Sequence, residues 1–65
     1  MRRRQRIMER EGHVCRLCQS AFATEVDHVV PIEDGGTDEA DNLQALCHAC
    51  HAAKTASENK RRTEL

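Results

Sequence analysis

The chain has 65 residues, 38% of them hydrophobic, and its only aromatic residue is Phe22. A chain this short supports one small domain, which is marginally stable unless a metal, a disulfide or a partner reinforces it. Its 10 Lys and Arg nearly balance 11 Asp and Glu, and no apolar stretch approaches the ~18 residues of a membrane span. Composition thus excludes a membrane partner, and the lack of aromatic residues argues against a single-strand reader that stacks bases.

The first half of the chain is predicted to contain a helix, a metal-binding turn and a strand. Residues 2–11 are good helix formers, and Gly12 follows them as a C-terminal stop. Residues 13–18 have the form of a tight Cys-x-x-Cys turn. β-Branched residues within 24–30 predict a strand, which Pro31 terminates.

The second half is predicted to hold a loop, a strand and a final helix. Residues 33–38 are polar and contain two glycines, which is typical of a loop. After a short turn at 39–41, residues 43–46 are expected to form the second strand. Alanine-rich sequence with later Lys and Arg predicts a helix over 48–62. This order of elements predicts one small α+β domain.

Charges are separated along the chain. Seven acidic residues and no Lys or Arg lie between residues 21 and 45, whereas basic residues gather near both ends. Basic ends can bind a polyanion such as nucleic acid, and the acidic centre can bind a cation. The alternative is that the basic runs are solvated helix faces. The residues that we expect to contact nucleic-acid phosphates are Arg2, Arg3, Arg4, Arg6, Lys54, Lys60, Arg61 and Arg62.

Four cysteines form two short pairs, Cys15 with Cys18 and Cys47 with Cys50, and 28 residues separate the pairs. Four thiolates can close a tetrahedral Zn²⁺ site of the structural type. They also allow three disulfide pairings. However, the N-terminal sequence has no apolar export signal. We therefore expect a reducing, cytoplasmic location, where paired Cys-x-x-Cys turns bind metal rather than form disulfides.

A carboxylate and two imidazoles remain outside this four-thiolate cage, namely Asp27, His28 and His51. Such a set is typical of an open, catalytic metal site. His51 adjoins the second cysteine pair, so it can alternatively replace a cysteine as a zinc ligand. His13 and His48 are expected to be surface residues. Taken singly, each polar residue also has a plain structural role, as a turn carboxylate, a surface imidazole or a cap.

The ordered pattern resembles the HNH nuclease family, whose fold is the ββα-metal, or His-Me, finger. The three letters of the family name fall on His28, Asn42 and His51. Residue 19 is Gln, where a glycine is common in the family. The resemblance covers residues 15–55, and the segments that carry it are 25–31, 34–37, 41–51 and 54–55.

The resemblance implies roles for four residues in phosphodiester hydrolysis. His28 is expected to be the general base that activates water. Asp27 and His51 are expected to hold a divalent cation such as Mg²⁺, Mn²⁺ or Ni²⁺. Asn42 is expected to hold the loop and orient His28. Adjacent strand residues point to opposite faces, so Asp27 and His28 serve one site only if the strand ends or twists beside them.

The implied function is a metal-dependent endonuclease that cuts DNA with low sequence specificity. It is expected to form a single domain over residues 1–65, with its core at about 12–57 and basic helical ends at 2–11 and 54–62. A homodimer or a protein partner is expected to supply any specificity, in the cytoplasm of a bacterium or a phage-infected cell. The alternative is a non-catalytic zinc module that binds nucleic acid or protein.

Overall fold

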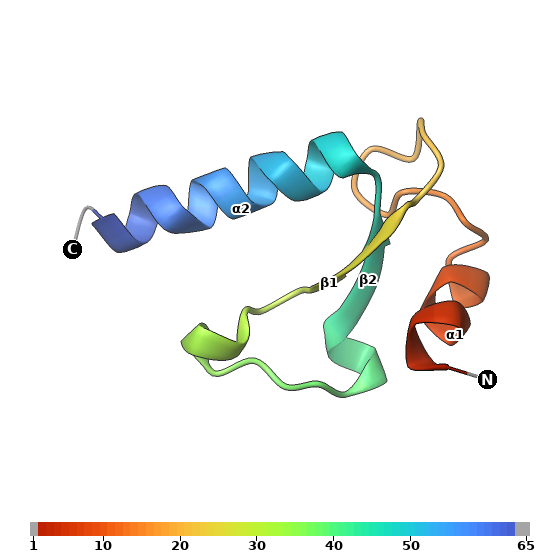
Figure 1. Cartoon of the computed structure of the whole chain (residues 1–65), viewed down its shortest axis with the longest axis horizontal. Coiled ribbons are helices and arrows are strands. Elements are labelled where there is room, and N and C mark those ends of the chain that lie inside the picture. Colours follow the sequence, from red (N-terminus) through yellow and green to blue (C-terminus); the bar gives the residue numbers. More distant parts are fainter. Residues whose placement is uncertain (1, 64–65) are drawn as a thin grey trace.

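The computed structural model describes residues 2–63, and its side chains are described as far as residue 60. A two-stranded sheet lies at the centre, with one helix beside it and a second helix leaving its end (Figure 1). This confirms the predicted small α+β fold. The elements are α1 (Arg3–Arg10), β1 (Glu25–His28), β2 (Leu43–Leu46) and α2 (His48–Thr63), with 3₁₀ turns at Ile32–Asp34 and Ala40–Asn42.

The first helix, α1, supplies half of one of the two buried hydrophobic clusters. Ile7 and Met8 are 2% and 7% exposed and pack against Leu43 and Ala45 of β2. The helix stops because Gly12 takes a left-handed φ of +67°, a conformation that glycine adopts at little cost. Since α1 packs on one face of the sheet, α2 contacts the opposite face.

The register of the sheet decides which side chains face α2. The strands are antiparallel, and Asp27 lies opposite Gln44 while His28 lies opposite Leu43. Because side chains alternate along a strand, Leu43 points to the α1 core and Gln44 to the other face, beside Asp27. The sheet therefore presents Asp27 to the helix that carries His51.

The first strand is shorter than the predicted 24–30 because the Asn42 side chain takes over its pairing. Oδ1 of Asn42 accepts from the Val30 amide at 3.0 Å, and Nδ2 donates to the carbonyls of Val30 at 3.0 Å and Thr37 at 2.7 Å. The loop passes so closely that a Cβ on Gly36 would lie 1.8 Å from the Val30 carbonyl oxygen. Asn42 therefore closes the loop, and only glycine fits at residue 36 without a shift of the backbone.

The second helix, α2, begins directly after β2 and extends beyond the sheet (Figure 1). Its first two turns carry His48, His51 and Lys54, and Lys54 forms an ion pair with Glu58 one turn later. Within residues 2–63, no helix has the length and apolar character needed to cross a membrane.

Candidate metal centres and active site

The four cysteines converge at the junction of β2, α2 and the first Cys-x-x-Cys turn. Their sulfur atoms all lie within 4.8 Å of one another, and the Sγ atoms of Cys18 and Cys47 are 3.9 Å apart. Ligands at the ordinary Zn–S distance of about 2.3 Å in a tetrahedron have sulfurs roughly 3.8 Å apart. The backbone amides of Cys18 and Cys50 each donate to the first sulfur of their own pair at 3.5 Å. The donor set therefore fits a tetrahedral metal ion.

The environment of the thiols favours a cation in this cluster. Burial acts to raise the pKa of the Cys15 thiol, but backbone N–H groups, first that of Cys18 and then that of Cys47, outweigh it and lower this pKa to about 6. Cys50 holds its proton through hydrogen bonds to Cys47 and Cys15, so its pKa rises to about 12. One thiolate is thus favoured without a cation, and a divalent ion offsets the repulsion that opposes the others.

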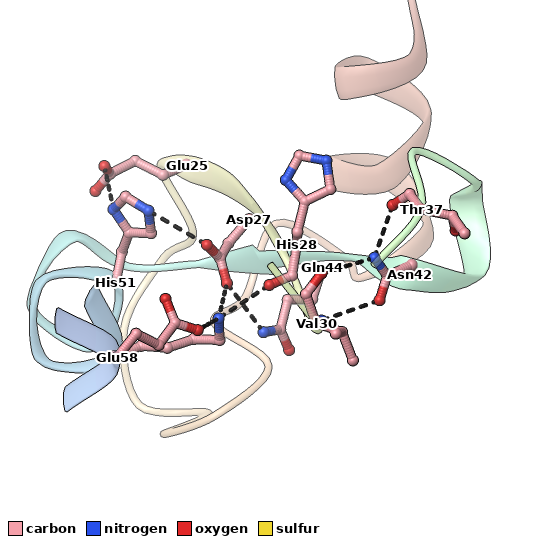
Figure 2. Close-up of polar contacts among 10 residues, drawn as sticks. Glu25, Asp27, His28, Val30, Thr37, Asn42, Gln44, His51 and Glu58 are labelled. Carbon is pink, nitrogen blue, oxygen red and sulfur yellow. Dashed lines mark hydrogen bonds and ion pairs between the residues drawn. The ribbon is translucent and has the colours of Figure 1, made fainter. Parts of the chain in front are cut away.

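A second convergence joins β1 to the first turns of α2. Oδ1 of Asp27 lies 3.4 Å from Nε2 of His51, and both side chains are partly buried (Figure 2). The other carboxylate oxygen of Asp27, Oδ2, pairs with Lys54 Nζ at 3.0 Å and accepts from Gln44 Nε2 at 3.3 Å. The structure therefore brings together the two residues expected to hold the second cation, and leaves one oxygen of Asp27 directed at His51.

The chemistry of this pair, one oxygen and one nitrogen ligand, fits a divalent cation. A carboxylate oxygen is a ligand that Mg²⁺ and Mn²⁺ prefer, whereas an imidazole nitrogen suits ions such as Ni²⁺. Two neighbouring ligands of an octahedral ion at about 2.1 Å lie roughly 3 Å apart, close to the 3.4 Å between Asp27 Oδ1 and His51 Nε2. Across the described residues, the only group of three or more Cys, His, Asp or Glu side chains close enough to hold one metal ion is that of the four cysteines, so no third protein ligand joins Asp27 and His51. With only these two protein ligands, an ion at Asp27 and His51 would be left largely open to water and substrate.

His28 ends β1 and directs its ring away from this pair (Figure 2). Its Nε2 lies 2.8 Å from Oδ1 of Asp38, in the loop after Thr37. The hydrogen bond from His28 lowers the pKa of Asp38, and the charge of Arg3 lowers it further. Asp38 is therefore an anion that accepts a hydrogen bond from the Nε2–H group of His28, and in this tautomer a neutral His28 ring carries its lone pair on Nδ1.

Lys54 lies in a different environment from the one expected of a phosphate contact. Its side chain is 17% exposed, and Nζ donates to the His28 carbonyl at 2.9 Å as well as pairing with Asp27 and Glu58. Burial acts to lower the pKa of Lys54, but the hydrogen bonds to Glu58 and Asp27 outweigh it and raise this pKa. Lys54 is held inward as a cation beside Asp27.

The basic residues of α1 lie on the surface, and several also hold the fold together. Arg3 donates to the Asp38 carbonyl at 2.9 Å and Arg4 to the Thr24 carbonyl at 2.6 Å. Arg10, which the sequence did not single out, donates to the carbonyls of Ala40 and Leu43. The other expected phosphate contacts are Arg2, Arg6 and Lys60, which are exposed, and Arg61 and Arg62, whose side chains lie outside those described.

Sequence reasoning missed four polar residues that complete this region. Glu25 lies two residues before Asp27 on the same strand, and this spacing places both on one face. Gln44 pairs with Asp27 across the sheet, a signal that appears only once the register is known. No sequence pattern indicates Asp38, because only the path of the loop between β1 and β2 brings it to His28. The four residues are Glu25, Asp38, Gln44 and Glu58.

Comparison with known proteins places this geometry in a family. The model of the HNH endonuclease family matches residues 15–57. The chain belongs to the HNH endonuclease family. Its fold is similar to the crystal structure of the HNH endonuclease of the deep-sea thermophilic bacteriophage GVE2 with a manganese ion, with a TM-score of 0.79 and 32% identity. That match covers 91% of this chain and 71% of the phage chain.

Curated relatives carry the same HNH segment within longer proteins. The Gene 4 protein of Mycobacterium phage D29 is 39% identical over 64 residues, which are 91% of this chain and 61% of that protein. The mouse (Mus musculus) DNA annealing helicase and endonuclease ZRANB3 is 45% identical over 42 residues, 63% of this chain and 4% of that protein. The Escherichia coli K12 type IV methyl-directed restriction enzyme EcoKMcrA is 49% identical over 35 residues, 54% of this chain and 13% of that enzyme.

Proposed function

We propose that this HNH protein is a metal-dependent endonuclease that hydrolyses DNA phosphodiester bonds with low sequence specificity. The observation that carries the proposal is the 3.4 Å distance between Asp27 Oδ1 and His51 Nε2. Asp27 directly precedes His28 on β1. A binding module needs no such convergence of a carboxylate and an imidazole. We further propose that residues 1–65 act as one domain, with the core at about 12–57.

Zinc is proposed as the structural ion, held by Cys15, Cys18, Cys47 and Cys50. Four thiolates at these separations suit Zn²⁺ better than a hard cation. The ion fixes the first Cys-x-x-Cys turn to the start of α2 and so fixes the position of His51, four residues after Cys47. The structural metal therefore helps to build the second site.

The second cation is proposed to be Mg²⁺, Mn²⁺ or Ni²⁺, held by Asp27 and His51. When bound, such an ion supplies charge neutralisation for the phosphate and a template for its orientation. The manganese ion named with the phage GVE2 endonuclease supports this assignment. Lys54 and Gln44 hold Oδ2 of Asp27 and keep Oδ1 directed at His51.

The protein side chains perform the proton transfer. Nδ1 of His28 takes a proton from the attacking water, while Asp38 holds the ring by its Nε2–H. Asn42 fixes both ends of this arrangement, because its amide donates to Val30 just after β1 and to Thr37 just before Asp38. Attack by water breaks the bond from phosphorus to the 3′-oxygen, which then takes a proton from solvent, so the products carry a 5′-phosphate and a 3′-hydroxyl.

Binding is proposed to come from the surface arginines and lysines at the two ends, in the cytoplasm where thiols stay reduced. Phosphate contacts by such residues give affinity that falls steeply with salt and depends little on sequence. A second copy of the chain or a partner protein is proposed to supply any sequence preference. The residues assigned to phosphates are Arg2, Arg3, Arg4, Arg6, Lys60, Arg61 and Arg62.

A metal series on supercoiled plasmid tests this proposal. The parent is expected to nick or linearise the plasmid with at least one of Mg²⁺, Mn²⁺ and Ni²⁺. Asp27→Ala and His51→Ala are expected to need higher metal concentrations, because each removes one ligand. Plasmid left intact by the folded, zinc-loaded parent with every ion would refute the nuclease assignment.

A further inference from the structure

Glu25 is the first residue of β1 and contacts two histidines of α2 with its two carboxylate oxygens. Oε1 lies 2.9 Å from Nδ1 of His51, and Oε2 lies 3.0 Å from Nδ1 of His48 (Figure 2 shows the His51 contact). The Glu25 side chain is 30% exposed, whereas that of His48 is 84% exposed. The contact to His51 is thus the more sheltered of the two.

The contact with Glu25 selects which nitrogen of His51 is available to a metal. An ionised carboxylate only accepts hydrogen bonds, so Nδ1 of His51 must carry the proton in this contact. A neutral imidazole then has a lone pair on Nε2 alone. Nε2 is the atom that lies 3.4 Å from Oδ1 of Asp27. Glu25 therefore sets both the tautomer and the orientation in which His51 meets Asp27.

The geometry also resists rotation of the ring. A half-turn about the Cβ–Cγ bond would move Nδ1 away from Glu25 and break the 2.9 Å hydrogen bond. The ring is thus held before the ion arrives, and less orientational freedom is lost when it binds. Carboxylates that accept the second N–H of a metal-binding histidine typically change metal affinity by about 10–100-fold.

We infer that Glu25 is a positioning residue for the second cation, acting through His51 without contacting the ion or the DNA. This inference rests on the proposed assignment of Asp27 and His51 as the ligand pair. A merely structural alternative is that Glu25 ties β1 to α2. His48 distinguishes the two roles, because it shares the tie but has no contact with Asp27.

Manganese binding by zinc-loaded protein tests the inference, measured by the loss of the free Mn²⁺ electron paramagnetic resonance signal. Glu25→Ala is expected to raise the Kd for Mn²⁺ by about 10–100-fold. Glu25→Gln keeps the size and one acceptor oxygen but removes the charge, so a smaller increase is expected. His48→Ala is the matched control and is expected to leave the Kd within about 3-fold. Bound zinc and far-ultraviolet circular dichroism are expected to match the parent in all three.

Either of two results would overturn the inference. One is an unchanged Mn²⁺ Kd in both folded Glu25 variants. The other is a His48→Ala variant that weakens Mn²⁺ binding as much as Glu25→Ala, which would assign Glu25 to the tie between β1 and α2. If Glu25→Ala does not fold, Glu25→Gln alone decides. Failure of the underlying proposal looks different, because Mn²⁺ would then bind Asp27→Ala and His51→Ala as well as the parent.

Discussion

Replacing Lys54 by Met separates two roles for this residue, phosphate contact and support of Asp27. Lys54 Nζ bonds Asp27, Glu58 and the His28 carbonyl, and its side chain is 17% exposed. Methionine keeps most of the length and the helix propensity but removes the charge and the donors. The structure therefore predicts a loss of stability, with little change in the salt dependence of DNA binding.

The size of the stability loss follows from the surroundings of the ion pair. Removing one partner of a buried pair costs about 3–5 kcal/mol, because the remaining charge is left uncompensated. Asp27 is 13% exposed and keeps the Gln44 hydrogen bond, so its charge is only partly uncompensated. We expect a loss of about 2 kcal/mol, since hydrogen bonds to charged groups contribute in this range. For a domain of this size, that loss lowers the Tm by roughly 8–16 °C.

Thermal melts at fixed free zinc and DNA binding at several salt concentrations measure the two effects. Lys60→Met is the matched control, because it removes an exposed lysine from the same helix. It is expected to lower the Tm much less than Lys54→Met, because interactions of exposed charged side chains contribute only about 0–1 kcal/mol. It is also expected to reduce the slope of log K against log salt by about 0.9, the value for one phosphate contact. A Lys54→Met protein with a parental Tm and a slope reduced by that amount would refute the support of Asp27 by Lys54.

Three further changes test other parts of the structure. Removal of the metal with a strong chelator under reducing conditions is expected to unfold the domain, because the small core is insufficient to keep it folded. A sharp melting transition with full helical circular dichroism in the metal-free protein would contradict this. Asp38→Asn is expected to slow plasmid cleavage by about 10-fold or more, since it weakens the hold on the His28 ring, and parental cleavage would show that Asp38 is dispensable. Gln19→Gly is expected to stabilise the fold by up to about 1 kcal/mol, because Gln19 has a φ of +55°; unfolding at a lower denaturant concentration than the parent would contradict it.

Local sequence predicted much of the fold because its signals act over short distances. The strand expected at 43–46 is β2, and the final helix begins at His48 as expected. The Cys-x-x-Cys spacing predicted a four-sulfur cluster, and the sulfurs do converge. The strand and the helix depend on neighbouring residues in the chain. The cluster joins two turns 28 residues apart, but each turn carries the local Cys-x-x-Cys spacing of a metal ligand pair, so spacing and residue type were sufficient.

Other features depended on contacts that the sequence does not encode locally. The strand predicted at 24–30 ends at His28, because Asn42, twelve residues beyond Val30, pairs with the backbone there. Lys54 was expected to contact phosphates, and its sequence position did not show that its charge is directed inward to Asp27. The partner of His28, Asp38, lies in a loop whose path no periodic pattern predicts.

The central claim is that His28 is the general base of a nuclease site, and cleavage by His28→Ala tests it most directly. This variant keeps the four cysteines, Asp27 and His51, so zinc content, fold and DNA affinity are expected to match the parent. Initial rates of plasmid nicking at a saturating concentration of the best divalent ion are expected to fall by about 10²-fold or more. A folded, zinc-loaded His28→Ala protein that nicks DNA at the parental rate would contradict the account.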